Sequence, residues 1–217
     1  MTVIVGILGA GGAVVGSDSI RVNERGEAFL DFDKTFLMQD PPVMGAFSGM
    51  AAFGDRTVAE HLEVALARGG FADMTEVRRR AGAGLARALA ESEMRKEVQR
   101  VELLLVGPGD LREGPLEMGV MDLMPGGEGG RIIVKHGLYR EKGTWVACGD
   151  GAACRAVRAR LQEISAQIRH MDGRALEALV REVIQRGIEA CGSNPAFPHI
   201  PACGGRPCVR IMAQGHV

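Results

Sequence analysis

The stretch TVIVGILGAGGAVVGSDS, residues 2–19, decides how the fold begins. Residues 3–8 and 13–16 are apolar and rich in β-branched side chains, a composition that favours buried strands. The glycine-rich segment 9–12 between them allows a tight turn. We therefore predict that the chain opens with a β-hairpin of two buried strands.

Strand and helix patterns alternate along the rest of the chain. Short apolar segments bounded by Gly or Pro predict strands, and apolar residues at three- and four-residue steps predict amphipathic helices. Strands are expected at 34–38, 43–48, 101–106, 116–123, 131–134, 144–148 and 207–212. Helices are expected at 57–67, 74–98, 152–168 and 174–190.

This order of elements predicts an α+β fold with antiparallel sheets, because runs of strands alternate with runs of helices. We expect the strands before residue 50 to form one sheet and those between 101 and 148 to form a second. The simplest packing is a four-layer αββα sandwich of two stacked antiparallel sheets with a helix pair on each outer face. The chain shows no linker, repeat or low-complexity segment, so residues 1–217 are predicted to be a single domain.

The composition argues against nucleic-acid and membrane partners. The 26 Lys and Arg against 27 Asp and Glu give a formal charge of −1, which offers no field for nucleic acid. No apolar run approaches the roughly 18 residues that a membrane span needs. The opening Met-Thr-Val lacks a basic leader, and the five cysteines form no C-x-x-C pair. We expect a cytoplasmic protein with free thiols.

The segment 9–12 resembles a dinucleotide-binding loop only at first sight. The G-x-G-x-x-G pattern needs a glycine where Val14 stands, and a helix must follow so that its N-terminus can hold the pyrophosphate. Residues 14–16 read as a strand instead. We interpret the glycines as a tight turn.

Three polar residues stand at equal intervals in this part of the chain. Thr2, Asp18 and Lys34 are each 16 residues apart, at a strand start, a strand end and a strand start. In a hairpin the end of the second strand returns beside the start of the first, which places Asp18 near Thr2. The next strand can bring Lys34 to the same edge. Taken singly, Asp18 could cap a turn and Lys34 could be a solvated edge charge.

Together these residues could activate a nucleophile. Removal of Met1 would leave Thr2 with both a hydroxyl and a free α-amine that titrates at about pH 8. An N-terminal amine is one known base for activating a threonine hydroxyl. Lys34 would keep the amine neutral by repulsion, and Asp18 would hold its ammonium form in place.

Four segments carry a resemblance to a known family. Residues Thr2–Ile7, Val14–Ser19, Asp33–Phe36 and Ala46–Gly49 are similar to the opening of proteasome β-type subunits, which are N-terminal-nucleophile hydrolases. The similarity extends over most of the chain. The chain also resembles the bacterial proteasome-related peptidases and the HslV type.

The resemblance implies a role for each residue of the site. Thr2 would be the nucleophile and its own base, Asp18 and Lys34 its electrostatic support, and the Gly49 N–H the oxyanion donor. Asp150 stands where a serine normally supports the threonine amine, and as an aspartate it is expected to raise the pKa of that amine.

Two further positions depart from the family pattern. Cys203 occupies the position of a second serine, in Cys203-Gly204-Gly205. The aspartate expected three residues before it falls on Ile200, so that support is missing unless His199 replaces it.

The function implied is a threonine peptidase that cleaves unfolded proteins or peptides in a homo-oligomeric ring, with an ATPase unfoldase as a possible partner. No cofactor and no metal are expected. Phe47, Phe32 and Arg21 are candidates for the substrate pocket by analogy. Two alternatives stay open: a catalytically silent ring or scaffold subunit, and an amidase of the same superfamily that acts on a small non-peptide amide.

Overall fold

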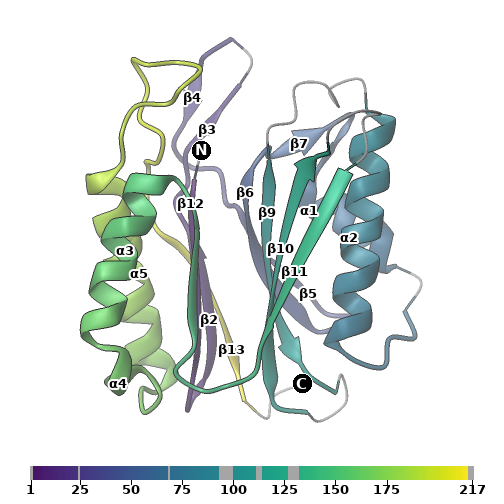
Figure 1. The fold of residues 1–217 in the computed structure, drawn as a ribbon, viewed down its shortest axis with the longest axis vertical. Coiled ribbons are helices and arrows are strands. Elements are labelled where there is room, and N and C mark those ends of the chain that lie inside the picture. The colour runs from purple at the N-terminus through teal and green to yellow at the C-terminus, as the bar shows by residue number, and fades with distance from the viewer. Residues whose placement is uncertain are drawn as a thin grey trace.

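Two antiparallel sheets lie face to face, and the longer helices lie on their outer sides (Figure 1). The predicted α+β class with antiparallel sheets is confirmed. Among the residues described below, no helix is long and apolar enough to cross a membrane. The computed structural model describes residues 2–23, 25–67, 69–92, 100–110, 114–126 and 132–214.

The first sheet has four strands in the order β12-β1-β2-β13. β1 and β2 form the predicted hairpin, in which Ile4 pairs with Ser17. β12 pairs with the other edge of β1, and β13 with the other edge of β2. The bounds are β1 Val3–Gly9, β2 Gly12–Ser17, β12 Trp145–Gly149 and β13 Cys208–Ala213.

The second sheet has five strands in the order β11-β10-β9-β6-β5. The predicted grouping of strands is therefore wrong. β5 and β6 lie in the same sheet as β9, β10 and β11, and β12 lies in the sheet of the opening hairpin. The apolar patterns locate each strand but do not encode its partner, which tertiary packing decides. The bounds are β5 Thr35–Met38, β6 Val43–Gly49, β9 Val101–Pro108, β10 Leu116–Pro125 and β11 Ile132–Tyr139. Two small hairpins pair β3 (Arg21–Val22) with β4 (Ala28–Phe29) and β7 (Ala52–Phe53) with β8 (Arg56–Thr57).

The helices follow the predicted ranges with two differences. The segment predicted at 152–168 is divided at Ile164 into α3 and α4. The segment predicted at 74–98 forms α2 up to Glu91, while residues 93–99 lie outside the described residues, as does residue 131 of the strand predicted at 131–134. The bounds are α1 Val58–Leu66, α2 Met74–Glu91, α3 Gly151–Glu163, α4 Ser165–Ile168 and α5 Gly173–Ala190.

Three apolar clusters fill the spaces between these elements. One joins α1 and α2 to the five-stranded sheet and includes Leu85 and Phe47. A second joins α3 and α5 to the four-stranded sheet and includes Val3 and Val5, and a third lies between the sheets and includes Ile4. Since side chains along a strand alternate between its two faces, Thr2 lies on the same face as Ile4, between the sheets.

Candidate active site

Thr2, Asp18 and Lys34 meet at the end of the sheets where the chain begins. Lys34 Nζ lies 2.5 Å from Thr2 Oγ1 and 3.2 Å from Asp18 Oδ1. The relative exposure of the three residues is 1%, 0% and 3%. The hairpin returns Asp18 to the start of β1, and the approach to β5 brings Lys34 in from the other sheet. The three residues form a buried, hydrogen-bonded cluster.

The backbone holds the Asp18 carboxylate in place. Oδ1 accepts a hydrogen bond from Val3 N at 3.1 Å, and Oδ2 accepts from Gly204 N at 3.0 Å and Ile20 N at 3.4 Å. These donors come from β1, from the segment after β2 and from the loop before β13. Asp18 therefore links three parts of the chain next to Thr2.

Burial acts on both charges of the pair. Burial raises the pKa of Asp18, against which the Lys34 charge and the backbone donors act. Burial likewise lowers the pKa of Lys34, against which the Asp18 charge acts. Because Lys34 Nζ donates to the hydroxyl oxygen of Thr2, its positive charge favours negative charge developing on that oxygen.

Asp150 reaches Thr2 through its backbone. Its N–H donates to the Thr2 carbonyl oxygen at 2.7 Å. Its carboxylate Oδ1 accepts from Ala152 N and Ala153 N, both at 2.9 Å, and so caps α3. The described contacts of this carboxylate are those of a helix cap, and its predicted effect on the threonine amine stays a prediction.

Gly149, the residue before Asp150, touches Thr2 directly. Its φ of +112° lies in a region that glycine adopts readily and other residues rarely do. A Cβ at this position would also overlap the Thr2 carbonyl oxygen. Gly149 and Asp150 thus fix the main chain of Thr2 from β12. The signal in the sequence is the glycine between a strand and an aspartate helix cap.

Gly49 ends β6 opposite Val101, with a φ of +91°. It adjoins Ser48, whose Oγ lies 3.4 Å from Glu102 Oε2, and Glu102 also accepts a hydrogen bond from the Gly149 backbone. This chain of contacts places Gly49 at the same end of the sheets as Thr2. A Cβ on Gly49 would overlap the carbonyl oxygen of Arg100.

Gly49→Ala is expected to lower kcat for peptide hydrolysis roughly 10²- to 10³-fold, because the methyl group forces the proposed oxyanion N–H out of position. Gly54→Ala is the matched control: Gly54 also has a positive φ, +63°, but no atom lies within 4 Å of its Cβ position. Steady-state kinetics of both variants check the prediction. Equal losses in the two variants would show that backbone strain, and not the position of Gly49, matters.

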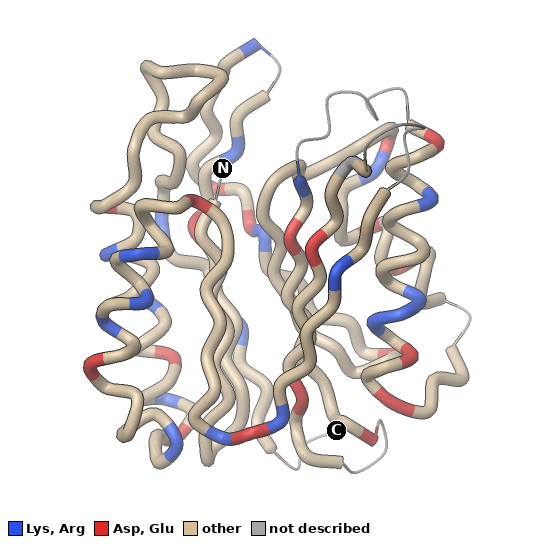
Figure 2. Tube along the Cα trace, viewed as in Figure 1, with Lys and Arg blue, Asp and Glu red and all other residues tan. Residues whose placement is uncertain are grey.

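Glu102 is a buried acid that the sequence analysis missed. It is 8% exposed, lies on β9 beside the site, and forms an ion pair with Arg100 at 3.0 Å. Arg100 also binds both oxygens of Asp122 on β10, at 2.7 and 2.8 Å. Figure 2 shows acidic segments on β9 and β10 at the level of the N-terminus. Glu102 contacts Ser48 of β6 and Gly149 of β12. Ser48 precedes Gly49 in the sequence, and Gly149 precedes Asp150.

Glu102→Gln is expected to gain stability relative to the parent as the pH rises from about 4 to 7. Burial raises the pKa of Glu102 above its usual 4.5, so the folded state holds this proton more tightly than the unfolded state. The stability contributed by this group is present below pH 4.5 and lost as the pH rises through the folded pKa. Urea unfolding at several pH values should show this relative change in the free energy of unfolding. A difference between the two proteins that does not vary with pH would contradict it.

Two positions depart from the pattern expected by resemblance, around Cys203 and around Ile200, and only the first lies next to Asp18. Cys203 is buried, and its N–H contacts the Cys191 sulfur at 3.3 Å, while the next residue, Gly204, binds Asp18. Burial raises the pKa of the Cys203 thiol, so it is protonated. Ile200 is buried, and His199 is exposed beside Phe197 with ring centroids 6.4 Å apart, so His199 does not stand in for an aspartate at Asp18.

The three expected pocket residues form one stack next to Lys34. The Arg21 guanidinium lies 5.2 Å from the centroid of the Phe32 ring, which meets Phe47 edge-on at 6.4 Å. Phe47 N donates to the Lys34 carbonyl oxygen at 3.2 Å. Phe47 is buried, and the described contacts therefore place an aromatic wall beside the cluster.

Comparison with known structures identifies the fold. This chain has a proteasome- and HslV-like fold. It is similar to Anbu (Gly-1 mutant) from Hyphomicrobium sp. strain MC1 (TM-score 0.65, 12% identity, covering 98% of this chain and 82% of that one). It is also similar to Anbu, an ancestral beta-subunit, from Yersinia bercovieri (TM-score 0.64, 14% identity, 97% and 82% covered). Eukaryotic HslV from Trypanosoma brucei matches with a TM-score of 0.53 and 16% identity, covering 97% of this chain and 99% of that one.

Sequence comparisons add no family to this result. No family model matches the chain, and no curated protein matches it. At 12 to 16% identity the structural likeness concerns the fold alone.

Proposed function

We propose that this protein is a threonine peptidase of the N-terminal-nucleophile type, active once Met1 is removed. The observation that carries the proposal is the buried contact of Thr2 Oγ1 with Lys34 Nζ, itself paired with Asp18. A lysine buried against a threonine hydroxyl and a carboxylate has no evident purpose in packing, since burying charges is costly. The same group of side chains suits activation of the hydroxyl.

In the proposed reaction the Thr2 α-amine takes the proton of the Thr2 hydroxyl as Oγ1 attacks the carbonyl carbon of a peptide bond. Lys34 stabilises the charge developing on Oγ1, and the Gly49 N–H donates to the oxyanion. The C–N bond then breaks, and the α-ammonium returns its proton to the departing amine. Water attacks the carbonyl carbon of the remaining ester and gives a proton to the same amine. The bond between that carbon and Oγ1 then breaks, and the α-ammonium returns the proton to Oγ1, which releases the acid product and regenerates free Thr2.

We further propose that the subunits form a closed ring, with the four-layer αββα arrangement in each subunit. The likeness of fold to Anbu and HslV supports this, as do exposed apolar residues on the edge strands of both flanks. These are Leu37 of β5 and Ile211 of β13 on one flank, and Ile133 and Tyr139 of β11 on the other. Unfolded protein is the proposed substrate, an ATPase unfoldase the proposed partner, and the cytoplasm the proposed location.

A catalytically silent ring subunit is the second candidate. It is favoured by Asp150, whose carboxylate caps α3, and by the neutral Cys203, where the family pattern has serines. Both candidates need the same fold but differ in the state of the N-terminus.

The proposal is tested by hydrolysis of a panel of peptide-aminocoumarin substrates, together with the intact mass of the same preparation. A first residue of Thr2 and steady turnover support the peptidase. A preparation that begins at Thr2, is folded and assembled, and turns over no substrate would favour the silent subunit.

A further inference from the structure

A pocket of about 490 Å³ opens beside the candidate active site. It lies between β12 of the first sheet and β9 and β10 of the second, and the start of α3 forms another wall. Gly149 and Gly151 line it on either side of Asp150. The size is within the range of small-ligand sites. None of the roles proposed above uses this space.

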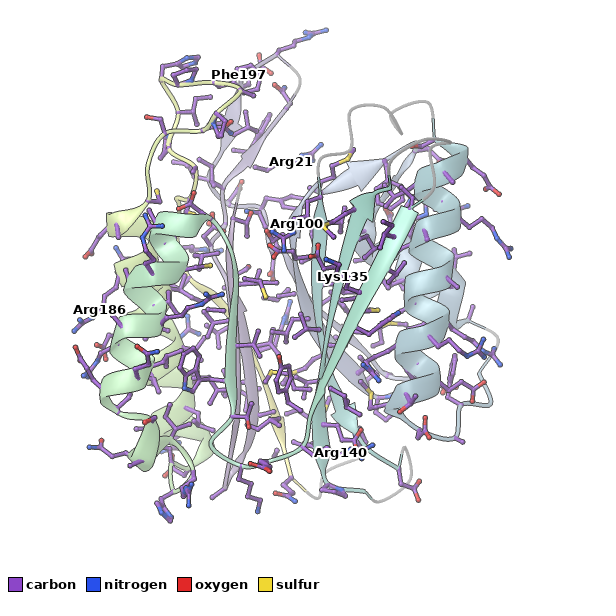
Figure 3. The ribbon with its side chains drawn as sticks, in the orientation of Figure 1. Arg21, Arg100, Lys135, Arg140, Arg186 and Phe197 are labelled. Carbon is purple, nitrogen blue, oxygen red and sulfur yellow. The ribbon has the colours of Figure 1, made fainter. Side chains whose placement is uncertain are left out.

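The charges of the pocket are not balanced. Arg100, which lies between the sheets in Figure 3, is paired with both acids of the pocket, Glu102 and Asp122. Within the part of the chain that the structure describes, Arg158 donates only to a neutral group, the Ala147 carbonyl oxygen, at 3.0 Å. Among the described residues, Arg155 forms no hydrogen bond or ion pair. Two arginines on successive turns of α3 therefore face the pocket without a carboxylate.

The thiols in the pocket wall do not compete for another role. Burial raises the pKa of Cys148 to about 12 and that of Cys154 to about 11. Both are neutral near pH 7, so neither offers a thiolate to a metal or an electrophile. The remaining wall near them is apolar. The pocket suits a short aliphatic stem that ends in an anionic group.

The position of the pocket relative to Thr2 decides which part of a substrate would enter it. Gly149 and Asp150 contact the main chain of Thr2, at its carbonyl, whereas Lys34 contacts its side chain. The pocket is thus next to the main chain of Thr2, at its carbonyl. The α-amine belongs to the same main chain and, in the proposed reaction, protonates the departing fragment, which therefore leaves past this part of Thr2.

We infer that this pocket binds a carboxylate on the departing half of the substrate, within the first two residues after the cleaved bond, through Arg155 and Arg158. The carboxylate can belong to an acidic side chain or to the C-terminus of a short departing fragment. Planar guanidinium groups bind carboxylates with two parallel hydrogen bonds, which gives the preference its direction. The inference rests on the proposed function and adds a substrate preference to it.

The experiment compares internally quenched peptides of one sequence that differ only after the cleaved bond. The first peptide has Glu and a C-terminal amide, and the second has Gln and a C-terminal amide. The third has Gln and ends in a free carboxylate at the second residue after the cleaved bond. For the parent protein, kcat/KM for each carboxylate peptide is expected to exceed that for the uncharged peptide about 5- to 20-fold. In the Arg155→Gln/Arg158→Gln double variant the ratio should fall to about 1. Preference for only one carboxylate peptide would identify which source the pocket takes.

Arg174→Gln is the matched control for the loss of a surface arginine. Arg174 is exposed on the first turn of α5, next to Gly173, which adjoins the hairpin turn at Gly11 at the far end of β1 from Thr2. Its ratio should equal that of the parent. A parent ratio of about 1, or a ratio that the double variant keeps, would overturn the pocket assignment while aminocoumarin hydrolysis still supports the peptidase. Absence of aminocoumarin hydrolysis by the parent would overturn the proposed function and this inference with it.

Discussion

Thr2→Ala is expected to reduce kcat/KM for peptide hydrolysis by roughly 10⁴- to 10⁶-fold without unfolding the protein, because it removes the proposed nucleophile itself. The hydroxyl contacts Lys34, which keeps its ion pair with Asp18 in the variant. The structural cost should therefore be small. Steady-state kinetics with aminocoumarin peptides, paired with a thermal unfolding curve, provide the measurement.

Two controls accompany this variant. Thr2→Ser keeps a hydroxyl and an amine and should retain activity within about 10-fold. Ser17→Ala removes another buried hydroxyl, one residue from Asp18. The Ser17 hydroxyl has no hydrogen-bond partner among the described residues. Its activity should equal that of the parent, since an unpartnered hydroxyl is lost at little cost. Retention of more than a tenth of the activity in Thr2→Ala would exclude Thr2 as the nucleophile.

Lys34→Met is expected to lower both stability and activity. It leaves Asp18 as a buried carboxylate without its cation, and breaking a buried ion pair in this way typically costs about 3 to 5 kcal/mol. The three backbone donors to Asp18 remain, so the lower end of this range is expected. Activity should fall roughly 10²- to 10⁴-fold, because the charge beside Thr2 Oγ1 is lost.

Urea unfolding and kinetics of the same variant separate these two effects. Lys142→Met is the control, since Lys142 is exposed in the turn before β12 and its loss should change the free energy of unfolding by less than about 0.5 kcal/mol. Adding Asp18→Asn to Lys34→Met should restore part of the stability, as the unpaired charge disappears, but no activity. Recovery of activity in the double variant would contradict the role given to Lys34.

The part of the site nearest the hairpin could be predicted from local sequence. The glycine turn fixes the return of β2, and the register that pairs Ile4 with Ser17 brings Asp18 back to the start of β1. Lys34 is different, because it belongs to the other sheet. Its distance from Thr2 depends on how the two sheets stack, and for this the sequence offered only an interval and a resemblance.

The missed residues show where sequence patterns stop. β6 pairs with β9, more than 50 residues away, and strand periodicity carries no information about such a partner. Glu102 did leave a signal, as the charged residue in the apolar strand VELLLV. A buried acid there requires partners, and naming Ser48 and Gly149 required the structure.

The most direct test of the account is mass spectrometry of the purified protein before and after treatment with a β-lactone or epoxyketone probe for N-terminal threonines. We expect an intact mass without Met1 and a single adduct that peptide mapping assigns to Thr2, absent from Thr2→Ala. An adduct elsewhere, or a folded protein that begins at Thr2 and forms no adduct, would contradict it.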